Sequence, residues 1–388
     1  MANYDVNDIV EVKKREHRRR RRKKFFMLLV LATIIGGMYY YRGKWLPKLQ
    51  GIGEKYQTIV NDGELAKGNF PIEISGGNSY QMEYSKSALY VLSDAYLYIY
   101  KEDGTLIEKR QHGYSNAVMK TNDGKALIYE CGGNKFRLES LRKNIYVKNT
   151  TNTVIFARLS DNGSVAVVTS SDKYSCELSV YDVSGTFIYG RECIDRLIDV
   201  SFNSDSSGAV LSFVSADNGS VITTSEKVSF NANETQWKSQ PFETFCLSTS
   251  INPDGAVVLG DTKCAYYNNK GEIGASYSYD GKLAGCDSNG QQIATILNDD
   301  DRRKYQLMII KNSKSEPFVI PFDEELRDVH IYDGLVYVMS KTKIDTYDFE
   351  GKLRSSADIS DSYTRFVRSD KYVFLLGYDK IDRIDYES

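Results

Sequence analysis

The residues with the most specific chemistry in this chain are three histidines and six cysteines. His17 lies in a basic tail, His112 in a polar stretch (QHGYSN) and His330 in an alternating strand pattern (DVHIYDG). A catalytic triad or a histidine metal site needs several partners that converge on one point. The sequence contains no G-x-S-x-G elbow, P-loop or H-E-x-x-H motif. We therefore expect no catalytic residue, no metal ligand and no cofactor.

An acidic run, Asp299-Asp300-Asp301 followed by Arg302-Arg303, has residue types that a cation site would use. Its spacing differs from that of a calcium-binding loop. Short polar runs of this composition are typical of hairpin tips, so we interpret the run as a solvated turn.

The cysteines contain one pair whose spacing indicates a disulfide. No C-x-x-C motif occurs, which argues against a zinc or redox motif. Cys176 and Cys193 flank a predicted hairpin that turns at residues 183–186. The predicted register places Cys176 opposite Cys193, Val180 opposite Tyr189 and Asp182 opposite Phe187. Opposed Cβ atoms lie about 4.5–5.5 Å apart in an antiparallel pair, near disulfide range. We predict a Cys176–Cys193 bridge, with two free buried thiols as the alternative. The pairing of the other four stays open: Cys131, Cys246, Cys264 and Cys286.

The composition limits the fold class, and the charge is distributed unevenly along the chain. The chain has 388 residues, 41% hydrophobic and 26% charged, with 29 tyrosines; this excludes collagen-like and small disulfide-rich classes and favours β-structure. Residues 1–24 contain ten basic and four acidic side chains, whereas residues 49–388 contain 37 basic and 48 acidic ones. A basic head on an acidic body suggests two compartments and no nucleic-acid partner.

An uncharged run from Phe25 to Tyr41 (FFMLLVLATIIGGMYYY) predicts a membrane-spanning helix at the short end of the usual length. Trp45 lies where an aromatic ring favours the far interface. Basic residues beside a first helix stay in the cytoplasm and also attract anionic lipid. The cationic run that precedes the segment consists of Arg18, Arg19, Arg20, Arg21, Arg22, Lys23 and Lys24.

We therefore expect a single-pass protein of the cell membrane. Residues 1–24 form a cytoplasmic tail, 25–41 the transmembrane helix, 42–69 a stalk and 70–388 an extracytoplasmic domain. A cleaved signal peptide is the alternative, but no small-x-small cleavage site follows the apolar run.

The domain contains an internal repeat. A turn residue precedes a short apolar strand at eight places, 35 to 47 residues apart: Ser87, Gly124, Gly163, Gly208, Gly255, Gly290, Gly334 and Lys371. The average interval is about 40 residues, the length of one propeller blade. A second marker, Tyr-x-x-x-Gly-x-apolar, recurs at about twice that interval, with its glycines at 104, 185, 271 and 351. There glycine supplies the left-handed conformation of a tight hairpin.

These repeats predict an all-β, eight-bladed β-propeller, with seven blades as the alternative. The last unit offers only three strands (TRFVRS, YVFLLG and KIDRIDY), whereas PIEIS at residues 71–75 precedes the first full unit. We expect residues 71–75 to complete the last blade by pairing with the strand around 381–386.

The segments LSVYDVSGTFIYGRE and KIDTYDFEGKLRSS are similar to the strand-turn-strand of quinoprotein repeats. They lack the tryptophan that follows the turn in those repeats, and the domain lacks the Gly-His and Trp-Asp pairs of WD40 repeats. In architecture the whole chain resembles an uncharacterised family of single-pass membrane propeller proteins of clostridial-type Gram-positive bacteria. That family lies within the broad WD40/quinoprotein-like propeller superfamily. The resemblance implies an extracytoplasmic propeller and brings no established activity.

Together these features predict a non-enzymatic binding or scaffolding module at the outer face of the membrane. Its expected partners are membrane lipid at the anchor and a protein or cell-envelope glycan outside. The alternative is a cell-envelope enzyme with its site in the propeller funnel, against which the few histidines and the missing tryptophans count.

Overall fold

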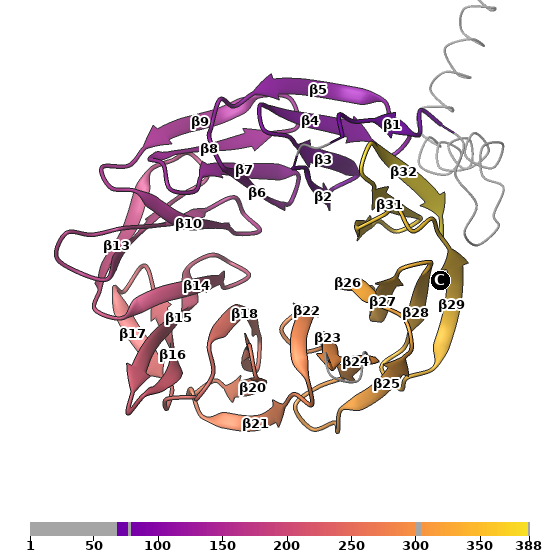
Figure 1. Ribbon diagram of the computed structural model, residues 1–388. Helices are drawn as coiled ribbons and strands as arrows, with labels where there is room; N and C mark the ends of the chain where they lie inside the picture. Colours follow the sequence, from indigo (N-terminus) through magenta and orange to yellow (C-terminus); the bar gives the residue numbers. More distant parts are fainter. Residues whose placement is uncertain (1–67, 77–78, 300–303, 387–388) are drawn as a thin grey trace, which may run out of the picture. The chain divides into compact units, whose positions relative to one another are not determined.

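The computed structural model describes residues 68–76, 79–299 and 304–386. These residues form strands β1 to β32, arranged as eight four-stranded antiparallel sheets around a common centre (Figure 1). The eight-bladed propeller is thus confirmed, and the seven-bladed alternative is wrong. No helix that could cross a membrane occurs among the described residues. The predicted tail, the segment from Phe25 to Tyr41, Trp45 and most of the stalk lie outside those residues.

Seven blades consist of four consecutive strands, innermost strand first. Blades 1 to 4 contain β2 (Gln81–Ser85), β3 (Ala88–Leu92), β4 (Tyr96–Lys101), β5 (Leu106–Gln111); β6 (Ala117–Asn122), β7 (Lys125–Glu130), β8 (Lys135–Ser140), β9 (Asn144–Asn149); β10 (Val154–Leu159), β11 (Val165–Thr169), β12 (Cys176–Tyr181), β13 (Phe187–Cys193); and β14 (Arg196–Phe202), β15 (Gly208–Asp217), β16 (Ser220–Ser229), β17 (Glu234–Lys238).

Blades 5 to 7 contain β18 (Cys246–Asn252), β19 (Gly255–Gly260), β20 (Lys263–Asn268), β21 (Ile273–Ser278); β22 (Lys282–Ser288), β23 (Ile293–Asp299), β24 (Lys304–Ile310), β25 (Phe318–Phe322); and β26 (Leu326–Tyr332), β27 (Leu335–Ser340), β28 (Lys343–Tyr347), β29 (Leu353–Asp358). Blade 8 contains β30 (Arg365–Arg368), β31 (Tyr372–Leu376), β32 (Lys380–Asp385) and β1 (Ile72–Glu73).

The first sequence marker identifies the second strand of every blade. Each of the eight turn residues precedes or opens one of the strands β3, β7, β11, β15, β19, β23, β27 and β31. These strands are buried along most of their length, because each lies inside its own sheet and between two neighbouring blades. A strand buried on both faces is a short continuous apolar run, which is why the marker was visible in the sequence.

Ring closure also follows the prediction. β1 pairs with β32, with Ile72 opposite Ile381 and Glu73 opposite Lys380. In Figure 1 the indigo β1 lies beside the yellow β32. Aromatic rings seal this seam between blades 8 and 1: Phe374 has centroid distances of 5.8 Å to Phe70 and 5.7 Å to Tyr84. The two ends of the domain therefore share one blade.

The second marker identifies the outer hairpins of blades 1, 3, 5 and 7. In blade 3, Asp182 N donates to Thr186 O and Gly185 N to Asp182 O, and Gly185 has φ of 85°. The Cys176–Cys193 and Val180–Tyr189 register is confirmed, but Phe187 lies opposite Tyr181 rather than Asp182. A bulge after the turn inserts one extra residue into β13 and shifts the pairing. The same shift occurs in the other three hairpins.

Each of these four glycines also receives an aromatic ring from the preceding blade. At Gly271, a Cβ would lie 2.6 Å from the Trp237 ring, so no other residue fits. The equivalent rings are Phe70 at Gly104, Tyr146 at Gly185 and Phe318 at Gly351. The blades are thus joined as four similar pairs; phenylalanine takes the position in two of them, and tyrosine and tryptophan in one each.

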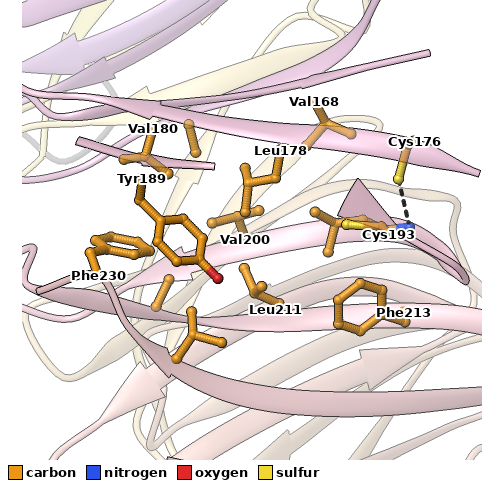
Figure 2. Close-up of a cluster of buried hydrophobic side chains, with 14 residues drawn as sticks. Val168, Cys176, Leu178, Val180, Tyr189, Cys193, Val200, Leu211, Phe213 and Phe230 are labelled. Atoms are coloured by element: carbon orange, nitrogen blue, oxygen red, sulfur yellow. Dashed lines mark hydrogen bonds between the residues drawn. The ribbon is translucent and has the colours of Figure 1, made fainter. Parts of the chain in front are cut away.

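Blades stack through apolar faces. Figure 2 shows the cluster between blades 3 and 4, in which Leu178, Val180 and Leu211 are no more than 1% exposed. Tyr189 and Phe230 pack at a centroid distance of 4.9 Å. Burial of each such side chain stabilises the fold by about 1.5–3 kcal/mol.

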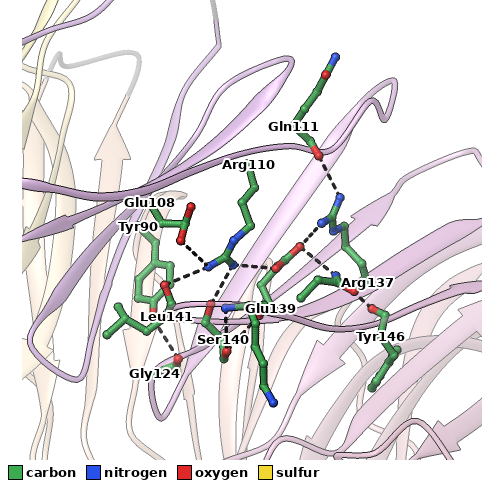
Figure 3. A network of polar contacts seen from close by, with 12 residues as sticks. Tyr90, Glu108, Arg110, Gln111, Gly124, Arg137, Glu139, Ser140, Leu141 and Tyr146 are labelled. Carbon is green, nitrogen blue, oxygen red and sulfur yellow. Dashed lines mark hydrogen bonds and ion pairs between the residues drawn. The ribbon is translucent and has the colours of Figure 1, made fainter.

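Blades 1 and 2 are additionally joined by a buried ion network (Figure 3). The Glu139 carboxylate is fully buried and accepts hydrogen bonds from Arg110 Nη1 at 2.7 Å and Asn144 Nδ2 at 3.0 Å. Arg137 forms an ion pair with Glu139 Oε1, the oxygen that Asn144 also binds. Burying an unpaired carboxylate costs folding free energy, and these partners offset that cost for Glu139.

Candidate binding site

The channel at the centre is lined by the inner strands, which have no neighbour on their channel side. Their free backbone N–H groups therefore need other partners. Carboxylates of the preceding blade supply them: Glu83 accepts from Thr121 N (2.6 Å), Asp199 from Thr249 N (2.7 Å), Asp287 from Ile331 N (2.7 Å) and Asp328 from Phe366 N (3.2 Å). The acidic residues of the channel thus join neighbouring blades.

His330 lies between two of these carboxylates. Its Nε2 is 3.4 Å from Asp328 Oδ2, and its Nδ1 is 3.9 Å from Asp287 Oδ2. Burial opposes protonation of the ring, but the hydrogen bond to Asp328 and the charges of both aspartates outweigh it and raise the pKa of His330 above 6.5. Its ring edge also packs on Phe366. His330 therefore ties blades 6, 7 and 8 together.

His112 is buried, and both of its ring nitrogens have partners. Nδ1 accepts from Tyr114 N at 3.1 Å, and Nε2 lies 2.9 Å from Ser93 O, so Nε2 carries the proton. Burial lowers the pKa of His112 and keeps the ring neutral. This histidine holds the connection between blades 1 and 2 in place.

The acidic run after β23 is consistent with a hairpin. Asp299 pairs with Lys304 across the antiparallel strands β23 and β24, and residues 300–303 lie outside the described residues. No group of three or more potential metal ligands occurs in the described parts of the chain.

Cys176 and Cys193 lie at the end of the apolar cluster between blades 3 and 4 (Figure 2). Both are buried, and both are free cysteines in the structure. Cys176 Sγ accepts from Leu197 N at 3.4 Å. A hydrogen bond from the Cys193 thiol is the main cause that lowers the pKa of the Cys176 thiol. The two residues face each other as predicted, and the disulfide itself stays a prediction.

Two polar cavities open from the channel. One of about 370 Å³ lies among the inner strands of blades 2 to 5, and one of about 240 Å³ lies beside His330. In the larger cavity Arg158 Nε binds Asp199 Oδ1 at 2.6 Å, and Asn122 Nδ2 binds Asp161 Oδ1 at 2.6 Å. The polar side chains of the channel thus pair largely with one another.

Blade 4 departs from the repeat. β15 and β16 are each 10 residues long, whereas the corresponding strands of the other blades have 5 to 7. The connection from β17 to β18, residues 239–245, folds back onto this hairpin. Thr223 and Phe242 exchange two backbone hydrogen bonds of 2.8 Å there. The added residues therefore form an ordered extension of blade 4.

A pocket of about 450 Å³, which we term the blade 4–5 pocket, lies between this extension and blade 5. Val221 and Phe245 line it and are 45% and 38% exposed. The remaining lining residues are Ser220, Glu243, Thr244, Asp261, Thr262, Lys263 and Ser278. Exposed apolar side chains beside a pocket with a polar rim are typical of protein-binding sites.

The blade 4–5 pocket has a net negative lining. Asp261 Oδ1 accepts from Phe245 N at 2.9 Å and Thr244 Oγ1 at 3.0 Å. Burial opposes ionisation, but these hydrogen bonds outweigh it and lower the pKa of Asp261 below 3.8. Lys263 lies 4.0 Å from Glu243 and over the Phe242 ring. Two carboxylates against one ammonium make the pocket suited to a cationic group.

The sequence predictions did not include any residue of the blade 4–5 pocket. One signal was available: the interval from Gly208 to Gly255 is 47 residues, the longest between successive turn residues. Excess length in one repeat maps to a connection on one face of the ring, where repeat proteins commonly bind partners.

The fold defines the class of this protein. The described domain is an eight-bladed β-propeller. The chain belongs to a family described as a family of unknown function (DUF5711), whose model matches residues 65–385. A search of curated proteins found no match.

Solved propeller structures resemble the domain along its length. The computationally designed Ika8 protein has a TM-score of 0.60 at 9% identity, covering 81% of this chain and 98% of that chain. BamB from Moraxella catarrhalis has a TM-score of 0.55 at 11% identity, covering 81% and 98%. Sqt1 from Chaetomium thermophilum, bound to the N-terminus of ribosomal protein L10, has a TM-score of 0.54 at 12% identity, covering 79% and 93%. Identities this low indicate a shared fold.

Proposed function

We propose that this protein is a membrane-anchored scaffold whose extracytoplasmic propeller binds a protein partner at the blade 4–5 pocket. Residues 25–41 anchor it, residues 42–69 form the stalk, and the cationic run 18–24 keeps the N-terminus in the cytoplasm and contacts anionic lipid.

One observation carries the binding site. The extension of blade 4 is hydrogen-bonded into place, yet it leaves Val221 and Phe245 exposed at the rim of a pocket. Single exposed apolar residues are common, but here two of them line one pocket, and a partner that covers both gains apolar burial.

The pocket favours a peptide over a glycan as its ligand. Val221 and Phe245 offer an apolar contact, and the ionised Asp261 with Glu243 offers a site for a cation. A peptide can present both in neighbouring side chains, whereas neutral glycans present neither charge nor extended apolar surface. Sqt1, a propeller of similar fold, has been solved with the N-terminus of ribosomal protein L10 bound.

Site-specific crosslinking tests this function. A photoreactive phenylalanine analogue is placed at position 245 of the full chain in native membranes, and for comparison at Val147, which is 55% exposed on β9. We expect one discrete protein adduct from position 245 and none from position 147. Val221→Asp should abolish the adduct without changing thermal stability. Equal labelling from both positions, or an adduct that survives Val221→Asp, would contradict the proposal.

The predicted topology is tested separately by proteolysis of intact cells. The domain should be degraded in intact protoplasts, since the cationic run places it outside. Survival of a fragment containing residues 70–388 until lysis would show the opposite orientation.

A further inference from the structure

The outer strand of each blade has one edge whose backbone groups have no partner within the sheet. Such edges template unwanted pairing unless charged residues, proline or shortness disfavour it. Seven of the eight outer strands carry one of these features: Glu108, Lys109 and Arg110 in β5, Lys148 in β9, Arg191 and Glu192 in β13, Glu234 and Lys238 in β17, Pro321 in β25, Arg354 and Asp358 in β29, and two residues only in β1.

β21 is the exception. Its sequence, Ile-Gly-Ala-Ser-Tyr-Ser, contains no charged residue and no proline. Its length of 6 residues is as great as that of β5, β9 and β29. Among the outer strands of the ring, β21 alone presents an edge that is open to pairing.

The register shows which of its backbone groups face outward. Tyr279 N donates to Thr262 O at 2.9 Å, and Tyr277 lies opposite Cys264. Bonding alternates along an antiparallel strand, so the backbone groups of Tyr277 face β20 and those of Ser276 and Ser278 face away from it. Both serines are exposed. They offer two donors and two acceptors to an added strand.

A cavity lies at each end of this edge. Ser278 belongs to the blade 4–5 pocket, with its exposed Val221 and Phe245. Gly274 lines a second cavity of about 490 Å³ together with Tyr266 and Lys314. A Cβ at Gly274 would meet only the Tyr266 carbonyl oxygen, at 3.8 Å, so this end of the groove is uncrowded. The four-residue step between the cavities spans about 14 Å of extended chain.

We propose that β21 receives an extended segment of the partner protein as a fifth strand of blade 5. The segment pairs with Ser276 and Ser278, places an apolar side chain against Val221 and Phe245, and directs a lysine or arginine at Glu243 and Asp261. Strand addition takes affinity from main-chain hydrogen bonds and specificity from side-chain pockets beside the edge. This mode of binding rests on the proposed function of the blade 4–5 pocket.

Charge selects the partner over a second copy of this chain. Two copies paired edge to edge would each offer the same uncharged strand, which has no cation for Glu243 and Asp261. A basic, apolar segment of another protein satisfies both carboxylates and both apolar side chains.

The chain provides a matched control for testing strand addition. Ser356 of β29 occupies the position equivalent to Ser276: Ser276 lies opposite Ala265 and Ser356 opposite Asp345, one residue beyond the bulge-adjacent pair in each hairpin. Ile359 N donates to Thr342 O there, as Tyr279 N does to Thr262 O in blade 5. A proline at either position removes an outward N–H and leaves the ladder of its own blade complete.

The experiment uses the full chain in native membranes, with the photoreactive residue at position 245 as the probe. Ser276→Pro should lower the adduct yield about tenfold, which corresponds to the loss of one or two net hydrogen bonds. Ser356→Pro should leave the yield unchanged. Ser278→Pro, compared with Asp358→Pro, repeats the test if thermal melting shows that Ser276→Pro disturbs folding.

The outcomes separate the two proposals. An adduct whose yield withstands both Ser276→Pro and Ser278→Pro overturns strand addition and leaves the pocket as the binding site. No adduct from position 245 in the unaltered chain overturns the proposed function and strand addition with it. An adduct that contains a differently tagged second copy of this chain overturns the partner assigned here.

Discussion

Aromatic residues occur both at the seam between blades 8 and 1 and at the blade 4–5 pocket, but they are buried at the seam and partly exposed at the pocket. At the seam, Phe374 is fully buried against Phe70 and Tyr84. At the pocket, the backbone N–H of Phe245 donates a hydrogen bond to Asp261, yet the residue is 38% exposed. The first arrangement stabilises a closed ring, and the second leaves apolar surface available for a partner.

The two regions also differ in how they depart from the repeat. At the seam the chain contributes the shortest outer strand, β1 with 2 residues, which suffices because its pairing closes the ring. At blade 4 it contributes the longest hairpin. The short strand β1 is enough to close the ring. The long β15–β16 hairpin adds surface that ring closure does not require.

The sharpest test of this contrast removes one feature from each region. A chain beginning at Gly77 lacks β1, its pairing with β32 and the Phe70 contact, so it should unfold with a free energy about 4 kcal/mol or more below that of a chain beginning at Gly68. Replacing residues 215–222 by an Asn-Gly turn should cost less than about 1 kcal/mol, because it removes solvent-exposed ladder. Urea unfolding measures both, and equal midpoints for the two starting points would contradict the closure.

Two phenylalanine truncations sharpen the comparison. Phe374→Ala should lower the free energy of unfolding by about 3–5 kcal/mol, because it leaves a cavity at the seam. Phe245→Ala should cost less than about 1 kcal/mol, since the side chain is partly solvated already. The same urea titrations apply, and a larger loss at position 245 than at position 374 would reverse the roles assigned to the two regions.

Blade 3 lies beside the extended blade and carries the predicted disulfide. A Cys176–Cys193 bridge closes a loop of about 18 residues, which in the chain-entropy model adds about 3 kcal/mol of stability. The natively produced protein should therefore resist thiol labelling at both positions and lose stability on reduction, whereas Cys176→Ser should expose Cys193 to labelling. Full labelling of both thiols without reductant would show that no bridge forms.

The smallest expected effect is a pH dependence that differs between the regions. The folded-state pKa of His330 is raised, so its protonated form adds stability that is complete below about pH 6.5 and is lost as the pH rises through the folded value. Because the side chain is 38% exposed, solvent screening keeps this below about 1 kcal/mol. His330→Gln should therefore lower stability at about pH 5.5 more than at about pH 8.5. An equal loss at both values would show that its charge contributes nothing.

Asp261 in the pocket has the opposite dependence. Its folded pKa is lowered, so its contribution is present above about pH 3.9 and lost as the pH falls through the lower folded value. Across neutral pH the pocket should therefore keep its charge, and crosslinking from position 245 should vary little between about pH 5.5 and pH 8.5.

Local patterns predicted most of the fold. The turn residues before each second strand, the Tyr-x-x-x-Gly hairpins and the spare PIEIS segment were sufficient for the blade count and the closure. The register between Cys176 and Cys193 also followed from turn geometry, although the bulge that places Phe187 opposite Tyr181 did not. That bulge occurs in the outer hairpins of blades 1 to 5 and 7, but only four of these six hairpins carry the Tyr-x-x-x-Gly marker, so the marker alone does not predict it.

The candidate site was far less accessible to sequence analysis. In the sequence alone, nothing distinguishes Val221, Phe245 and Asp261 from ordinary strand and turn residues. They meet because the blade 4 connection folds back through the Thr223–Phe242 bridge and places Phe245 beside the next blade. The same holds in the channel, where Asp199 and Thr249 are joined across blades.

By itself, the sequence determined the strand period, the blade number, the closing strand and the charge asymmetry between tail and domain, because each depends on neighbouring residues or on a repeated interval. Only the tertiary structure decided which carboxylates bond across blades, which aromatic ring covers each hairpin glycine, and that the edge of β21 borders two cavities. These features depend on how one blade is rotated and packed against the next, and local turn chemistry and side-chain alternation do not encode that relation.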